Sequence, residues 1–220
     1  MLRELAFQVV EVYRILDRAV AGFAARTGLC CPDGCGDCCR SEKVEATVLE
    51  CLPLAFELFY TLQAELILKR LEKNNAQKQC VLYRPDYTAA GLWGCTQYRH
   101  RAVVCRLFGF AGNRDRLGNA QLAMCRVMKQ KTRVNAYEID LDDPHAPLPL
   151  FTDAGLRITA LHPGLGTVRM PINMALREAL LKVGMLLELS GATISDQPFD
   201  HEQPPTKPLV PHSPPGRRAA

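Results

Sequence analysis

The sequence predicts a mainly α-helical fold in which helices surround an irregular, cysteine-rich loop core. Apolar residues recur at steps of three and four over most of the chain, which is the spacing of one buried helix face. A central stretch from 80 to 118 lacks this periodicity and is rich in Gly, Tyr and Pro. The chain holds ten cysteines in 220 residues, and half of them stand between positions 30 and 39. Loops of this kind need a tether, and the cysteines are the obvious source of one.

The first two helical patterns occupy the N-terminal third of the chain. Residues 2–27 carry an apolar stripe, and Gly28 is the expected end of that helix because glycine adopts the left-handed backbone of a C-cap. A second pattern extends over 44–71. Pro53 lies inside it, and we expect this proline to kink or divide the helix because it lacks a backbone N–H.

The second half of the chain gives a less regular pattern. A short helix is expected at 102–107 within the central loops, a third long helix at 119–137 and a fourth at 170–190. The stretches LDDPHAPLPLF and LHPGLG are expected to be turns. The last 25 residues contain seven of the fifteen prolines and few apolar side chains, which predicts a disordered tail at 196–220.

Composition and charge limit the classes of protein to which the chain can belong. Charged residues interrupt every apolar run near the N-terminus, so we expect no secretory signal, and no run approaches the length of a membrane span. We therefore expect a cytoplasmic protein without a membrane partner, in a reducing compartment where thiols stay unbridged unless a metal binds them. The net charge of +4 is spread in small basic groups, which favours a solvated surface and not a nucleic-acid partner.

The cysteine spacing indicates metal binding. A C-x3-C-x2-C-C run is formed by Cys31, Cys35, Cys38 and Cys39, and its C-x2-C step around a glycine points two sulfurs at one ion. Four more cysteines follow at wide intervals in the central loops, at Cys80, Cys95, Cys105 and Cys125. The even number of cysteines leaves disulfides as an alternative, but the adjacent Cys38 and Cys39 would bridge each other only with strain.

Three residues near the cysteine run need a separate interpretation. Cys51 falls in the apolar pattern of the second helix, where a cysteine usually acts as a small buried hydrophobe. Cys30 is left undecided. His100 is a reserve ligand because histidine replaces cysteine in many zinc sites.

The runs CPDGCGDCCR and GCTQYRHRAVVCRLFGF, with a later Cys125, resemble the YkgJ-type CxxCxxCC cysteine-cluster family of zinc- or iron-chelating proteins, over residues 31–126. Ala102 stands where the family has proline, which removes no ligand. The resemblance implies chelation of zinc or iron. The matching residues are Cys35, Cys38 and Cys39 for the cluster, Cys80 for the next cysteine, Cys95, Tyr98, Arg101, Cys105 and Arg106 for the following block, and Cys125 for the last cysteine.

Zinc and iron both remain open as the metal, because an all-thiolate site suits a zinc ion and a 4Fe-4S cluster alike. Five arginines flank the cysteines, where each could offset thiolate charge; pairing of Arg101 and Arg106 with carboxylates or carbonyls is the favoured interpretation. The spacing of Cys31, Cys35 and Cys38 also resembles the cluster loop of radical S-adenosylmethionine enzymes, but those enzymes are built on a barrel of strands and helices.

The sequence thus predicts one domain at 1–195, made of the helix 2–27, a metal-binding core at 30–126 and a helical part at 127–195. Its function is expected to be metal binding, with a structural, carriage or sensing role, and its protein partners are unknown. The alternative is an iron–sulfur enzyme, either redox or an S-adenosylmethionine-dependent protein methyltransferase resembling flagellin lysine methylase. The expected ligands are Cys31, Cys35, Cys38, Cys39, Cys80, Cys95, Cys105 and Cys125.

Overall fold

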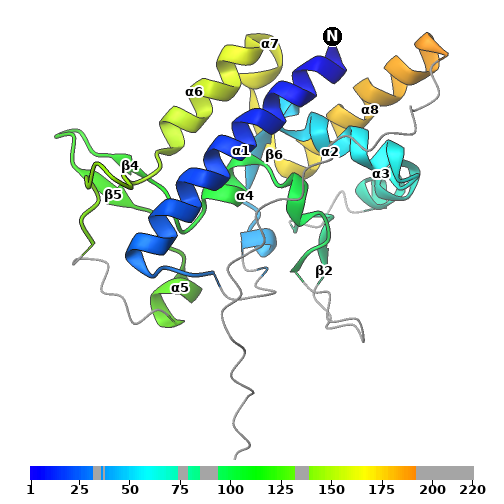
Figure 1. The fold of residues 1–220 in the computed structure, drawn as a ribbon. Helices are drawn as coiled ribbons and strands as arrows, with labels where there is room; N and C mark the ends of the chain where they lie inside the picture. Colours follow the sequence, from blue (N-terminus) through cyan, green and yellow to red (C-terminus); the bar gives the residue numbers. More distant parts are fainter. Residues whose placement is uncertain (32–35, 37, 74–78, 85–93, 132–138, 192–220) are drawn as a thin grey trace, which may run out of the picture.

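The computed structural model describes residues 1–31, 36, 38–73, 79–84, 94–131 and 139–191, and the predicted tail at 196–220 lies outside them. The prediction of a mainly helical fold is confirmed (Figure 1). Within the described residues, no helix combines the length and the apolar character that crossing a bilayer requires. The helices are α1 (Leu2–Thr27), α2 (Val48–Tyr60), α3 (Ala64–Lys73), α4 (Val103–Leu107), α5 (Arg126–Lys131), α6 (Phe151–Leu161), α7 (Pro163–Gly166) and α8 (Ile172–Ser190), with short 3-10 turns η1 (Cys38–Arg40) and η2 (Tyr98–His100).

Three short antiparallel strand pairs connect these helices. The pair β1 (Glu45–Thr47) and β6 (Arg169–Pro171) places Ala46 opposite Met170, directly before α2 and α8 begin. The starts of these two helices are thereby fixed side by side. The other pairs are β2 (Tyr83–Arg84) with β3 (Gly94–Cys95), and β4 (Gly112–Arg114) with β5 (Ala120–Leu122).

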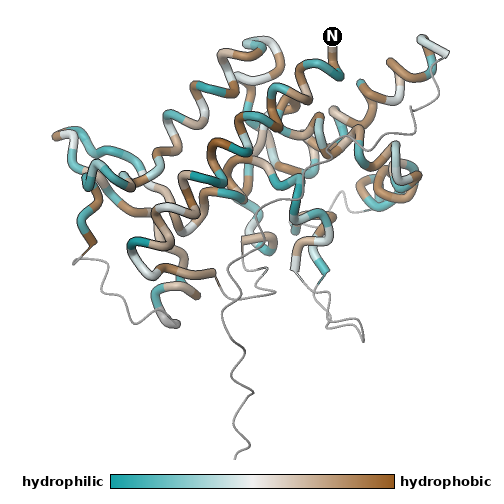
Figure 2. Tube along the Cα trace, in the orientation of Figure 1, coloured by the Kyte–Doolittle hydropathy of each residue, from teal (hydrophilic) through white to brown (hydrophobic). Residues whose placement is uncertain are grey.

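The main apolar core lies where α1, α2 and α8 meet. Helix α2 packs on α8 and on α1, while α6 lies along another side of α1 (Figure 1). In Figure 2 the α1 trace alternates between brown and teal along its length, as expected of a helix with one buried face. The side chains that are almost completely buried include Val9 of α1, Leu49, Leu52 and Leu58 of α2, and Leu176, Leu180 and Val183 of α8.

Of the two outcomes expected at Pro53, a kink or a division of the helix, the structure contradicts the division. Helix α2 continues through Pro53, whose ring is fully buried, so burial in the core offsets the one hydrogen bond that proline removes. The break comes at Leu62, which adopts the left-handed conformation with φ of 57°. The N–H of Gln63 then donates to the Leu58 carbonyl at 2.7 Å, which closes the end of α2 before α3 starts.

The predicted helix at 119–137 is wrong in its first part. Residues 120–122 form β5, and within the described residues of this range the helix occupies 126–131, while 132–138 lie outside them. The Asp115 carboxylate accepts from the N–H groups of Leu117 and Asn119, both at 2.9 Å, and this turn closes a hairpin. The structure also adds α6 and α7, which we expected to be turns or did not predict.

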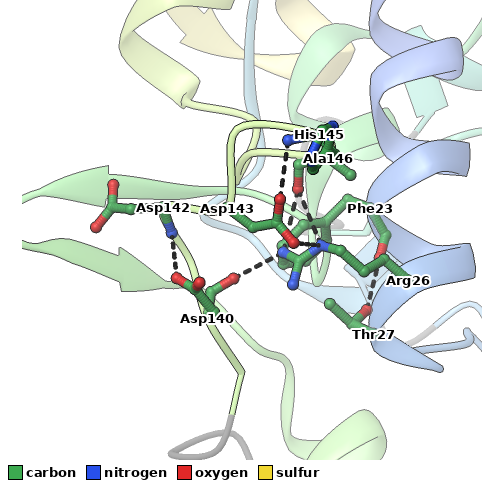
Figure 3. A network of polar contacts seen from close by, with 8 residues as sticks. All are labelled: Phe23, Arg26, Thr27, Asp140, Asp142, Asp143, His145 and Ala146. Carbon is green, nitrogen blue, oxygen red and sulfur yellow. Dashed lines mark hydrogen bonds and ion pairs between the residues drawn. The ribbon is translucent and has the colours of Figure 1, made fainter.

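A second, smaller apolar cluster lies at the C-terminal end of α1. It consists of Phe23, Leu29, Met128 and Leu148. Arg26 fastens it by donating to the carbonyl oxygens of Asp140 at 2.7 Å and Ala146 at 3.1 Å, with the Asp143 carboxylate 3.6 Å away (Figure 3). The point at which the chain leaves α1 for the cysteine-rich run is therefore fixed.

Glu50 joins α2 to α4 from inside the core. Its side chain is only 2% exposed, and burial raises the pKa of its carboxyl group. One carboxylate oxygen accepts from the N–H of Thr47 at 3.0 Å, which completes a capping box at the start of α2. The other accepts from the N–H of Val103 at 2.8 Å, at the start of α4, whose own N-cap residue makes no side-chain hydrogen bond. One carboxylate thus caps two helices.

Replacing Glu50 should therefore destabilise the protein strongly. Glu50→Ala leaves the buried N–H groups of Thr47 and Val103 without an acceptor, and we expect a loss of about 2–4 kcal/mol in the free energy of unfolding. Urea denaturation followed by circular dichroism measures this loss. Glu65→Ala on the surface of α3 is the matched control and should change stability by less than about 0.5 kcal/mol. Equal stability of the two variants would contradict the role given to Glu50.

Candidate metal centre

Cys39 lies at the centre of a group of cysteine side chains. It shares hydrogen bonds with the thiols of Cys38, its neighbour in η1, and of Cys95 in β3. Cys39 is buried, while Cys38 and Cys95 are half-buried. Two segments that are separated by more than fifty residues therefore present their sulfurs to one place.

Cys80 reaches the same place through backbone contacts. Its N–H donates to the carbonyl of Cys39 at 3.0 Å. Its loop is also fastened to α8, because the Asn173 side chain accepts from the N–H of Val81 at 2.9 Å and donates to the carbonyl of Gln79 at 2.8 Å. One amide side chain holds both flanks of Cys80.

The β2–β3 pair aligns Cys95 with the cysteine run. Tyr83 is the register partner of Cys95, and the N–H of Tyr83 donates to the carbonyl of Cys80 at 3.0 Å. Gly36 of the cysteine run lies directly against the Tyr83 ring, where any side chain on Gly36 would overlap the ring. The absence of a side chain at Gly36 thus allows the run to approach β2 closely.

Cys105 is contributed by α4. The start of this helix is held by Glu50, and Arg101 fastens its middle by donating from Nη1 to the Cys105 carbonyl at 3.1 Å. Its thiol lies within electrostatic reach of Cys38, Cys80 and Cys95. We call Cys38, Cys39, Cys80, Cys95 and Cys105 the inner thiol set.

Burial and mutual contact perturb the ionisation of this set. Hydrogen bonding to its neighbour raises the pKa of Cys39, and the complementary bond from Cys39 lowers the pKa of Cys38 to about 7. The bond from Cys39 also lowers the pKa of Cys95. Burial raises the pKa of Cys80 to about 12 and raises that of Cys105. Several sulfurs therefore keep their protons in the metal-free protein, and a metal ion must displace these protons when it binds.

Arg106, in the same block, is committed to structural contacts. It forms an ion pair with Asp17 of α1, and its guanidinium lies 4.0 Å from the centroid of the Tyr13 ring. Its Nε donates to the Arg101 carbonyl at 2.8 Å. The expectation that Arg106 pairs with carboxylates and carbonyls is thereby confirmed.

Three candidate ligands remain, and Cys125 is the one that the structure places in another part of the molecule. Cys125 packs with the second apolar cluster, where its sulfur accepts from the N–H of Met128 at 3.3 Å. Cys31 is half-buried and follows Leu29 of that same cluster. Cys35 lies outside the described residues. The structure thus brings five of the eight candidates together.

The structure also shows where Cys51 and His100 lie. Cys51 is buried in the main apolar core, as expected, although Cys80 and Cys105 lie close enough to influence its pKa, which burial raises well above the usual value. His100 is buried with its Nε2 4.0 Å from a carboxylate oxygen of Glu57 on α2.

Two residues that position the thiols were not found from the sequence. The sequence did carry a signal for Glu50, because Thr47-x-x-Glu50 before an apolar run is a capping-box pattern. Asn173, which holds the Cys80 loop, gave no signal, since its two partners lie more than ninety residues away.

The chemistry of the inner thiol set fits zinc or iron, because thiolates are the ligands that select zinc and iron–sulfur clusters. These thiols carry no disulfide bridges. Among the described residues, no three His, Cys, Asp or Glu side chains already surround a common point at ligand distance.

Comparison with known proteins identifies the chemical class of this site. Residues 29–137 match the CxxCxxCC family model, whose description is "Putative zinc- or iron-chelating domain". The match includes every cysteine of the inner thiol set, together with Cys31 and Cys125. No curated protein and no solved structure matches the chain. Through residues 29–137, the chain belongs to the CxxCxxCC family.

Proposed function

We propose that this protein binds zinc, iron or an iron–sulfur cluster through the inner thiol set, and that the metal joins the cysteine loops to the helical core. The observation that supports this most directly is the convergence of three chain segments at Cys39, which shares hydrogen bonds with Cys38 and Cys95 and accepts the Cys80 N–H at its carbonyl. The spaced cysteines lie on short elements: β2 and β3 have two residues each, and α4 has five. Elements of this size need a tether, which metal–thiolate bonds supply.

The proposal includes a role for the bound metal. A site closed by four thiolates leaves no coordination position for a substrate, which favours a structural, carriage or sensing role over catalysis at the metal. We extend the proposal to Cys31, Cys35 and Cys125, which the cysteine spacing of the sequence makes candidate ligands. We also place the protein in the cytoplasm, where thiols remain available to a metal. The alternative of an iron–sulfur redox enzyme or methyltransferase stays a prediction, because no contact among the described residues favours it.

The first experiment is anaerobic purification followed by a visible absorption spectrum and by zinc, iron and acid-labile sulfide assays on one sample. A charge-transfer band with matching iron and sulfide identifies a cluster. Stoichiometric zinc in a colourless protein identifies a zinc site. A preparation that holds neither metal, and that binds neither when both are supplied under reducing conditions, refutes the proposal.

Cys39→Ser should abolish most metal binding, because Cys39 is the thiol that contacts sulfurs from both η1 and β3. We expect the affinity for Zn²⁺ to fall by at least about 100-fold, since even residues behind the ligands change affinity by 10- to 100-fold. Competition with a chromophoric chelator measures the affinity. Cys30→Ser is the matched control, because Cys30 is exposed and stands outside the proposed ligands, and its affinity should equal that of the unmodified protein. If Cys39→Ser binds as tightly as Cys30→Ser, the ligand assignment is wrong.

Removal of the metal should loosen the cysteine loops and leave the helical core folded. The core of α1, α2 and α8 is held by apolar burial, whereas the segments 79–84 and 94–107 are short and contain the proposed ligands. Amide hydrogen exchange before and after chelation measures this difference. We expect protection to fall by about tenfold or more in those two segments and to change little in α2 and α8. Uniform loss of protection over the whole chain would show instead that the metal supports the entire fold.

A further inference from the structure

Arginine side chains surround the cysteines in the sequence, but the structure uses them differently. The positive charge of Arg106 is balanced by an ion pair, because the Asp17 carboxylate contacts its guanidinium. Arg40, next to Cys39, is exposed to solvent. Arg101 differs from both, since it is half-buried and lies on the segment between Cys95 and Cys105.

The Arg101 guanidinium is held in place by neutral groups. Its Nε donates to the Tyr98 carbonyl at 2.9 Å and its Nη1 to the Cys105 carbonyl at 3.1 Å. The guanidinium carbon lies 3.5 Å from the centroid of the Tyr98 ring. Among the residues that the structure describes, no carboxylate forms an ion pair with Arg101. The position of this guanidinium is thus fixed, and its charge is not balanced by a carboxylate of the described residues.

The Arg101 guanidinium is held beside a proposed metal ligand. Its Nη1 lies 3.1 Å from the carbonyl oxygen of Cys105, and Arg101 stands between Cys95 and Cys105 in the chain. A fixed positive charge therefore lies next to a member of the inner thiol set.

The charge of a metal–thiolate centre explains why such a cation is needed. A divalent ion bound by four thiolates has a net charge of about −2, because each thiol loses its proton on binding. Placing such a charge in a partly buried site is unfavourable unless a cation lies nearby. The Arg101 guanidinium is already held by two carbonyl groups and an aromatic ring. It therefore supplies the positive charge without a further loss of side-chain entropy.

We propose that Arg101 is the counter-cation of an anionic, all-thiolate metal centre formed by the inner thiol set. This inference rests on the proposed metal-binding function and deepens it, because it specifies the charge of the loaded site. A mixed centre of two thiolates and two imidazoles would be neutral and would have no use for this cation. The position of His100 beside Glu57 agrees with an all-thiolate centre.

Two substitutions separate the charge of Arg101 from its tethering contacts. Arg101→Lys keeps the positive charge but loses the planar fork that spans the Tyr98 and Cys105 carbonyls. Arg101→Met loses both the fork and the charge at similar length. Arg40→Met is the control for removing an exposed charge beside a ligand, where solvent and salt screen the interaction.

The experiment measures the Zn²⁺ affinity of the full-length reduced protein and its three variants by competition with a chromophoric chelator. We expect Arg101→Met to bind about 10- to 100-fold more weakly than the unmodified protein, and Arg101→Lys and Arg40→Met to stay within about threefold of it. Equal weakening of Arg101→Lys and Arg101→Met would show that the fork and not the charge matters, and would overturn the inference. Unchanged affinity in Arg101→Met would also overturn it. If the unmodified protein binds no Zn²⁺ and no iron, the proposed function fails and the inference fails with it.

Discussion

The candidate metal centre depends on hydrogen bonds that fasten cysteine-bearing loops to a helical core. Apolar packing contributes, because Cys39, Cys80 and Leu82 are buried in the main apolar core, but it is not directional and does not by itself fix where each loop starts. Glu50 fixes the start of α4, which carries Cys105, and Asn173 fixes both flanks of Cys80. Both residues extend from helices of the main core, α2 and α8. The geometry of the sulfurs is therefore set by the most rigid part of the molecule.

This arrangement brings thiol groups and charged side chains close together around the site. Hydrogen bonding to Cys38 raises the pKa of Cys39, and the pKa values of Cys38 and Cys95 fall in return. Metal binding requires deprotonated thiols, so a metal ion that binds here displaces the remaining thiol protons. Arg106 does not take part in this balance, since Asp17 and Tyr13 engage its guanidinium on α1.

The sequence predicted the long helices well, because their periodicity extends over many residues. The helix 2–27 has the predicted bounds and ends at Gly28, which adopts a φ of 69°. The strand pairs were missed because two or three residues are too few to show a period of two. The hairpin at 112–122 takes the first residues of the helix predicted at 119–137, because the Asp115 turn outweighs weak helical spacing there. Helix α6 was predictable, since Phe151, Ala154, Ile158 and Leu161 have helical spacing.

The site could be predicted only as a set of ligands and not as an arrangement. Spacing and family resemblance identified the cysteines, but no local pattern states that Cys39 faces Cys95 while Cys125 packs beside Met128. That division follows from contacts between distant segments, such as those made by Asn173 and by Gly36 against Tyr83.

The apolar helical core and the proposed metal centre share residues, and this has a physical consequence. A zinc ion that forms the only core of a small domain must stay bound for the domain to stay folded. Here the core of α1, α2 and α8 contains large apolar side chains of its own, and Cys39 and Cys80 pack into the same core. We therefore expect metal occupancy to change the order of the loops at 79–84 and 94–107 more than that of α2 and α8. A carriage or sensing role would use such a difference, whereas a purely structural ion does not need it.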